Sequence, residues 1–191
     1  MRIVDCIGEV CPMPVIRTKK ALDESQGEQL EIRISNGISL ENVQKYLYSR
    51  GYRDAVCITK DGYFAVIVNT GVTVKKIKSN DVNSIVAISS DVMGQGDDDL
   101  GRRLMQGFIY ALSQLEVLPH KVVLYNRGVL LAAEGSPVLE DLHVLTVSGV
   151  QVLSCGLCVE YFQCEDKLMV GEITNMYAIV EMMQTGNVIR P

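Results

Sequence analysis

Residues 5–14 read DCIGEVCPMP, and this stretch decides how the first part of the chain is organised. A short apolar run ends at Gly8, and Cys11 then stands immediately before Pro12, with a second proline at Pro14. Proline is tolerated in the first turn of a helix, where its missing N–H has no partner to lose. The two prolines therefore predict a helix start, with Pro12 near the first helical position.

Cys11 is the first candidate reactive residue. Unpaired N–H groups and the positive end of the helix dipole favour a thiolate over a thiol at such a position, and the thiolate is the nucleophilic form of cysteine. A buried structural cysteine is the alternative, which we consider weaker because an inert cysteine does not need this geometry. Cys6 could resolve an oxidised Cys11, but it lies near a strand end and is expected to pack in the core. Cys57, within a strand pattern, is also expected to pack in the core.

The composition indicates a globular protein. The chain has 191 residues, of which 48% are hydrophobic and 21% charged, enough for two small domains with their own cores. No apolar run reaches the ~20 residues of a membrane-spanning helix, and the N-terminus lacks a signal-peptide layout. We therefore expect a cytoplasmic protein with reduced cysteines. The net charge of −5 and the lack of Trp argue against nucleic-acid binding.

Charge divides the chain into two units. Residues 1–71 carry nine basic and nine acidic side chains, whereas residues 84–191 carry six basic and thirteen acidic ones. We predict a first domain over residues 1–70, a connection over residues 71–83 and a second domain over residues 84–191.

The first domain is predicted to be a small two-layer α/β sandwich with the order β-α-β-α-β-β. Alternating apolar residues indicate half-buried strands, and an Asp-Gly turn joins the last two strands as a hairpin. The expected strands are 2–5, 30–35, 55–59 and 63–68, and the expected helices are 12–24 and 39–51.

The second domain is predicted to be an α/β doubly wound parallel sheet, because apolar strands alternate with helices. The expected strands are 85–89, 121–125, 129–133, 150–154 and 168–170, and the expected helices are 100–115, 136–149 and 174–185. Sites in such sheets lie at the C-terminal ends of the strands, and Cys155 directly follows one of them.

Cys155 and Cys158 form a Cys-x-x-Cys pair at this predicted strand-to-helix turn. Such a pair can lower the pKa of its first sulfur and form a reversible disulfide, although a thioredoxin-like motif would stand earlier in its fold and beside a Trp. Cys164 adds a third sulfur, but zinc commonly takes four ligands in two spaced pairs. The glycines near Asp97 lack nucleotide-binding spacing, and residues 97–99 are expected to cap a helix. We expect no metal and no cofactor.

These motifs resemble two known families. The first part is similar to TusA-type sulfur carriers, and the second to DsrE-like domains; the pair in this order resembles the YedF-type sulfurtransferase-like selenium metabolism proteins. The residues that carry the first resemblance are Asp5, Gly8, Cys11, Pro12, Pro14, Val15, 19–22, Ser35, Asn36, 41–43 and Gly51. Those that carry the second are 90–94, 125–129, 154–158 and 171–176.

The resemblance implies a persulfide on Cys11 and a DsrE-type cysteine at Cys155, with Cys158 an addition. It also implies a cysteine desulfurase or another sulfur or selenium donor protein, and a homo-oligomer; it does not identify the acceptor protein. Ser35 and Met13 stand where the TusA pattern often has acidic residues. Selenium comes from the family name alone.

We hypothesise a sulfurtransferase-like relay of sulfur or selenium, in which Cys11 accepts the chalcogen and Cys155 receives it or regenerates the carrier. The alternative is a redox or interaction module in which Cys155 and Cys158 cycle as a disulfide. An RNA-binding module is the weakest hypothesis, because the first unit is neutral and the second acidic.

Overall fold

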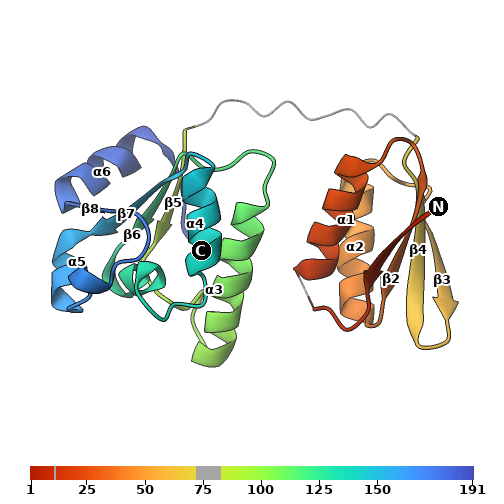
Figure 1. Ribbon diagram of the computed structural model, residues 1–191, viewed down its shortest axis with the longest axis horizontal. Helices are drawn as coiled ribbons and strands as arrows, with labels where there is room; N and C mark the ends of the chain where they lie inside the picture. Colours follow the sequence, from red (N-terminus) through yellow and green to blue (C-terminus); the bar gives the residue numbers. More distant parts are fainter. Residues whose placement is uncertain (11, 72–82) are drawn as a thin grey trace. The chain divides into compact units, whose positions relative to one another are not determined.

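The computed structural model describes residues 1–10, 12–71 and 83–191 (Figure 1). The chain divides into two compact units, Met1–Lys78 and Ser79–Pro191. Of the predicted connection, only Gly71 and Asn83 lie within the described residues. In these described ranges, no helix combines the length and the apolar character that crossing a membrane requires.

The first unit is a two-layer α/β sandwich. Its four strands follow the order β1-β2-β4-β3, with β1 parallel to β2 and the other pairs antiparallel. Both helices lie on the same side of the sheet (Figure 1), which confirms the predicted β-α-β-α-β-β sandwich. The elements are β1 (Arg2–Cys6), α1 (Met13–Glu24), β2 (Gln29–Ile34), α2 (Gly37–Ser49), β3 (Val56–Lys60) and β4 (Tyr63–Asn69).

The core of the first unit lies between the sheet and its helices. Leu30, Ile32 and Ile34 alternate along β2, and all three are fully buried. Cys6 belongs to the same core, as predicted. The prediction for Cys57 is wrong, since this cysteine is exposed. It lies on β3, an edge strand whose five residues are all exposed.

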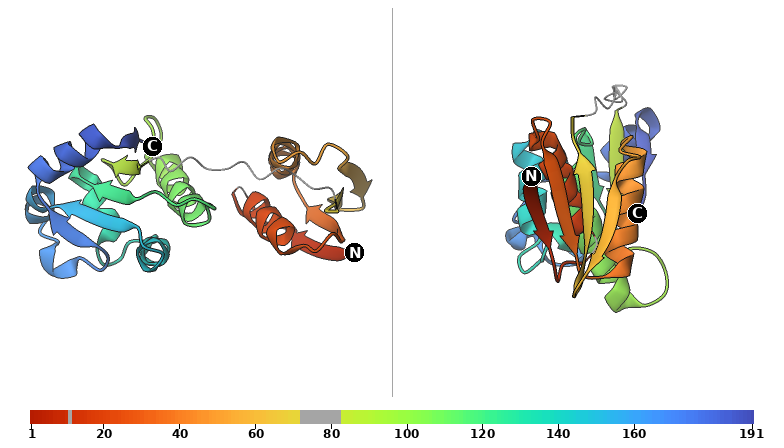
Figure 2. Two further views of the ribbon diagram at one scale, coloured as in Figure 1. Left: turned by 90° about the horizontal axis from the view of Figure 1, so that it is seen from above. Right: turned by 90° about the vertical axis from the view of Figure 1, so that its right-hand side faces the viewer.

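The second unit has a parallel sheet with the strand order β8-β7-β6-β5-β9. Helices α3 and α4 pack on one face and α6 on the other, as Figures 1 and 2 show. The predicted doubly wound sheet is therefore confirmed. The elements are β5 (Ser84–Ile88), α3 (Asp98–Ser113), β6 (Lys121–Leu124), η1 (Asn126–Ala132), α4 (Leu139–Val147), β7 (Gln151–Cys155), α5 (Gly156–Tyr161), η2 (Glu165–Lys167), β8 (Glu172–Thr174), α6 (Met176–Thr185) and β9 (Asn187–Ile189).

Two predicted strands of the second unit are wrong. Residues 129–133 lie mostly in η1, a 3₁₀ helix, because Asn126 adopts a left-handed conformation with φ of 49° and turns the chain out of the sheet direction. Residues 168–170 contribute only an isolated bridge between Leu168 and Ala133. The edge strand is β8, which follows Gly171.

The predicted helix over residues 100–115 is present as α3, and its buried face includes Leu112. Leu100 and Leu104 are exposed, whereas Met105 and Ile109 are buried against the sheet. Asp97 is the N-cap, and its Oδ1 accepts a hydrogen bond from the Leu100 N–H at 2.8 Å. This confirms the capping role expected at the start of the helix.

Candidate functional site

The first candidate site is the loop that precedes helix α1. Cys11 itself lies outside the described residues. Pro12 is the N-cap of α1, and Pro14 lies in the first helical turn, which confirms the predicted helix start. The Met13 N–H donates to the Val10 carbonyl at 3.0 Å. No acidic residue lies in the first turn of α1, so no carboxylate there opposes negative charge at the helix start.

The side chains of Ser35 and Asp5 accept hydrogen bonds from the backbone of the first loop residues. Ser35, which directly follows β2, accepts a hydrogen bond from the Gly8 N–H through its Oγ at 2.9 Å. Asp5 Oδ1 accepts from the Ile7 N–H at 3.1 Å. Gly8 has a φ of 80°, in the left-handed region that favours glycine. Asp5, Gly8 and Ser35 therefore fix the backbone of the loop residues that precede Cys11.

Asn36 ties the second half of the loop to helix α2. Its Nδ2 donates to the Glu9 carbonyl at 3.3 Å. Its Oδ1 accepts from the Ser39 N–H at 2.8 Å, which caps α2. A single amide side chain thus joins the loop before Cys11 to the start of a second helix.

The carboxylate of Glu9, a residue of this loop, acts on the buried thiol of Cys6 at the end of β1. Glu9 accepts a hydrogen bond from Arg17 at 2.5 Å through Oε1, while its buried Oε2 has no hydrogen-bond partner among the described residues. Burial, followed by the charge of Glu9, raises the pKa of Cys6 to about 12. Cys6 is therefore a protonated core thiol, and this chemistry does not suit it to resolve an oxidised Cys11.

The second candidate site is the thiol pair at the end of β7. Cys155 is the last residue of β7 and the N-cap of α5, and it is fully buried. Cys158 lies in α5 and is half-buried. Both are free thiols, and Cys158 packs against the small apolar cluster that contains Cys155. The structure therefore brings together the two cysteines that the sequence paired.

A backbone donor points at the outer sulfur of this pair. The Asn126 N–H donates to Cys158 Sγ at 3.1 Å. Burial raises the pKa of Cys158 above its ordinary value, the Asn126 N–H opposes this rise, and the neighbouring Cys155 thiol adds to it. Asn126 begins η1, just after β6, and Cys158 lies in α5, just after β7, so the segments that follow two neighbouring parallel strands supply the donor and the thiol.

An ion pair holds the segment that carries this donor. Arg127 Nε and Nη2 donate to the two carboxylate oxygens of Asp91 at 2.7 and 2.8 Å. This contact lowers the pKa of Asp91. Gly128 leaves no space for a side chain, because a Cβ atom there would lie 2.2 Å from the Ile88 carbonyl oxygen. Asp91, Arg127 and Gly128 therefore fix the position of Asn126.

The sequence did not single out Asn126, Asp91 or Arg127 as individual site residues. Asp91 lies in the loop after β5, and Asn126 and Arg127 follow β6. Their position after adjacent parallel strands was the available signal, because such loops meet at one edge of a sheet.

Cys164 does not join the thiol pair. It is buried in the apolar core, and its Sγ donates to the Val159 carbonyl at 3.6 Å. Burial raises its pKa. Within the described parts of the chain, no group of three or more His, Cys, Asp and Glu side chains could hold a metal ion.

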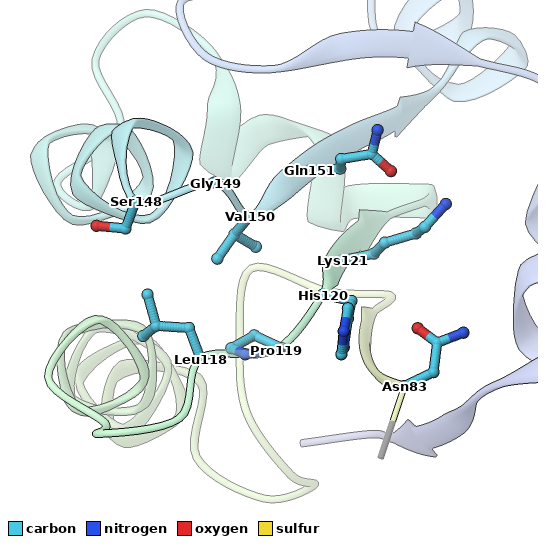
Figure 3. Close-up of a pocket in the computed structure, with 9 residues that line it drawn as sticks. All are labelled: Asn83, Leu118, Pro119, His120, Lys121, Ser148, Gly149, Val150 and Gln151. Atoms are coloured by element: carbon cyan, nitrogen blue, oxygen red, sulfur yellow. The ribbon is translucent and has the colours of Figure 1, made fainter. Parts of the chain in front are cut away.

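A cavity of about 380 Å³ lies at the N-terminal ends of the parallel strands, whereas the thiol pair follows the C-terminal end of β7 (Figure 3). Lys121 and Gln151 line it from the first positions of β6 and β7, whereas Cys155 ends β7. His120 also lines the cavity, so this histidine is remote in the fold from the thiol pair. The remaining lining residues are Asn83, Leu118, Pro119, Ser148, Gly149 and Val150.

Comparison with known proteins identifies the first unit. The family described as Sulfurtransferase TusA matches residues 2–70. A Methanocaldococcus jannaschii protein named as a candidate sulfur carrier is 33% identical over 69 residues, which cover 36% of this chain and 92% of that protein. The SirA-like protein of Desulfitobacterium hafniense is 36% identical, with a TM-score of 0.35, and the match covers 38% of this chain and 100% of that structure.

A further solved structure, the ychN protein of E. coli, is 16% identical, with a TM-score of 0.45. This match covers 57% of the chain and 99% of that structure. The family match covers residues 2–70. It therefore includes Asp5, Gly8, Ser35 and Asn36, whose hydrogen bonds or backbone conformation fix the loop residues before Cys11. Through this first unit, the chain belongs to the TusA family.

Proposed function

We propose that this protein is a sulfur or selenium relay that carries a persulfide-type chalcogen on Cys11. The observation that carries this proposal is the 33% identity over 69 residues to a candidate sulfur carrier, of which the match covers 92%. The hydrogen bonds from Ser35 and Asn36 to the loop before Cys11 support it. Residues 1–70 form the carrier unit in this proposal, and residues 84–191 form the unit with the second thiol site.

The proposed loading step is a thiolate attack. The Cys11 thiolate attacks the terminal sulfur of a donor persulfide, forms a new S–S bond, and releases the donor as a thiolate. The donor is a cysteine desulfurase or another sulfur or selenium donor protein. Reduced thiols are required, which fits the cytoplasm and the free state of the five described cysteines.

Cys155 and Cys158 form the second thiol site of the relay. In this proposal the chalcogen passes from Cys11 to the thiol pair at the end of β7. The half-buried Cys158 and its Asn126 donor support a role in holding a charged sulfur. We further expect a homo-oligomer, whose state size-exclusion chromatography with light scattering would establish.

Incubation with a cysteine desulfurase and cysteine, followed by intact-mass measurement, tests the relay. We expect the chain to gain a sulfur atom, and we expect the Cys11→Ala variant to lose that gain. Cys57→Ala is the matched control, because Cys57 is an exposed thiol of the same unit. Equal loading of the wild type and Cys11→Ala at every cysteine would contradict the proposal.

The second candidate function is a thiol–disulfide redox module. The Cys-x-x-Cys spacing favours it, together with the packing of Cys158 against the cluster that contains Cys155. A thiol titration with and without oxidant separates the two functions. Disulfide formation confined to this pair, with Cys11 inert toward a persulfide donor, would favour the redox module over the relay.

A further inference from the structure

We propose that the second thiol site is a release site, in which Cys158 accepts the chalcogen and Cys155 expels it as free hydrosulfide or hydroselenide. The expulsion forms a disulfide between Cys155 and Cys158. This inference rests on the proposed relay only for the supply of the chalcogen. It reverses the order of the two cysteines that the DsrE-like resemblance implied, since that resemblance placed the primary thiol at Cys155.

The burial of the two sulfurs assigns their order. Cys155 is 0% exposed and packs among Val123, Ile85 and Ile179. A protein or small-molecule persulfide cannot reach this sulfur without opening the core. Cys158 is only half-buried, so Cys158 is the member of the pair that an incoming donor meets first.

Hydrogen bonding also favours Cys158 as the acceptor. The Asn126 N–H lies 3.1 Å from Cys158 Sγ, and a donor aimed at a sulfur stabilises negative charge on that atom during transfer. The bidentate contact between Arg127 and Asp91 holds the residue next to this donor. Asp91 and Arg127 are therefore positioning residues, because they act on the sulfur through Asn126.

Loading transfers one sulfur atom to Cys158. The Cys158 thiolate attacks the terminal sulfur of the donor persulfide, and a bond forms between these two atoms as the S–S bond of the donor breaks. The donor leaves as a thiolate. The product is a persulfide on Cys158, which packs against the apolar cluster that contains the Cys155 thiol.

Release uses the electrons of Cys155. The Cys155 sulfur attacks Cys158 Sγ, and the bond from Sγ to the terminal sulfur breaks. The terminal sulfur of the ionised persulfide takes the bonding electron pair and the Cys155 proton and leaves as hydrosulfide. The Cys155 sulfur is oxidised as it enters the disulfide, and the departing sulfur is reduced to the sulfide level. A dithiol reductant then restores the two thiols.

A single-turnover assay on the full chain tests the release step. The Cys11→Ser variant, fully reduced and freed of reductant, is mixed with glutathione persulfide. Hydrosulfide is trapped with a bimane reagent, and the protein is analysed by intact mass and peptide mapping. We expect one hydrosulfide per chain and a loss of two hydrogens that maps to a Cys155–Cys158 disulfide.

Two further substitutions in this background separate the roles of the cysteines. Adding Cys155→Ala should leave a stable persulfide on Cys158 and abolish hydrosulfide release. Adding Cys158→Ser should abolish both loading of the pair and release. Adding Cys57→Ser is the matched control and should release hydrosulfide as the parent does. Equal melting temperatures establish that each variant is folded.

Two results would overturn the release site. The first is undiminished hydrosulfide release from the folded Cys155→Ala variant. The second is formation of persulfide on Cys155 in the Cys158→Ser variant as fast as the parent protein loads Cys158. Failure of the relay looks different, because Cys11 of the wild type would then gain no sulfur from a desulfurase while the Cys11→Ser protein still released hydrosulfide.

Discussion

The environments of Cys6 and Cys158 affect the pKa of a cysteine thiol in two different ways. Burial is the largest influence on both and raises both pKa values. The second influence differs in sign, because Cys6 meets the negative charge of Glu9 whereas Cys158 receives the Asn126 N–H. Burial beside a carboxylate gives an inert thiol, while partial burial beside a directed donor preserves the capacity to hold negative charge.

The largest expected effect concerns thiol reactivity in the native protein. Cys6 is fully buried, whereas Cys57 is exposed. We expect Cys6 to react with iodoacetamide on the order of a thousandfold more slowly than Cys57, because Cys6 reacts only after an opening of the core. Peptide mapping after timed alkylation gives both rates, and comparable rates would show that the core of the first unit does not protect its thiol.

Two glycine substitutions compare the loops of the two units. Gly128→Ala would place a Cβ atom 2.2 Å from the Ile88 carbonyl oxygen, and we expect it to destabilise its unit by about 3 kcal/mol. Gly8→Ala meets no atom within 4 Å, so only its φ of 80° opposes it, at about 1 kcal/mol. Urea unfolding of both variants measures the difference, and an equal loss would contradict the tight packing of η1.

A third prediction concerns alkaline pH and the first unit. The pKa of Cys6 is raised from 9.0 to about 12 in the folded state. Above pH 9 the unfolded chain therefore loses a proton that the folded chain keeps, and stability falls as the pH rises from about 9 toward 12. Urea unfolding at several pH values should show a shallower fall for Cys6→Ala than for the wild type. Parallel curves would show that Cys6 titrates normally.

The smallest expected effect concerns the contact that positions Asn126. Asp91→Asn removes the charge that holds Arg127, so the Asn126 N–H should lie less accurately against Cys158. We expect the pH midpoint of Cys158 alkylation to rise by about half a unit. Asn126→Gly is the control, since glycine keeps both the N–H and the left-handed conformation. An unchanged midpoint in Asp91→Asn would show that Asp91 does not position the Asn126 N–H against Cys158.

The sequence predicted those features that depend on local pattern. The two prolines predicted the start of α1, and Cys155 was expected at the C-terminal end of β7. The exposure of Cys57 was not predicted, because alternation indicates a strand but does not say that β3 lies at the edge of its sheet.

The positioning contact at the second site could not be derived from the sequence. Asp91 and Arg127 are 36 residues apart, and their pairing depends on β5 and β6 lying side by side. The close approach of Gly128 to the Ile88 carbonyl depends on the same two strands. Tertiary contacts decide both features, so local propensity carries no signal for them.

The most direct test of the relay is the position of sulfur along the chain after loading. The reduced protein is incubated with a cysteine desulfurase and cysteine, its persulfides are trapped by alkylation, and each cysteine is mapped by mass spectrometry. We predict persulfide on Cys11 in the wild type and a larger amount on Cys11 in the Cys158→Ser variant, whose second site cannot accept it. Persulfide on Cys57 at the level of Cys11, or on no cysteine, would contradict the relay.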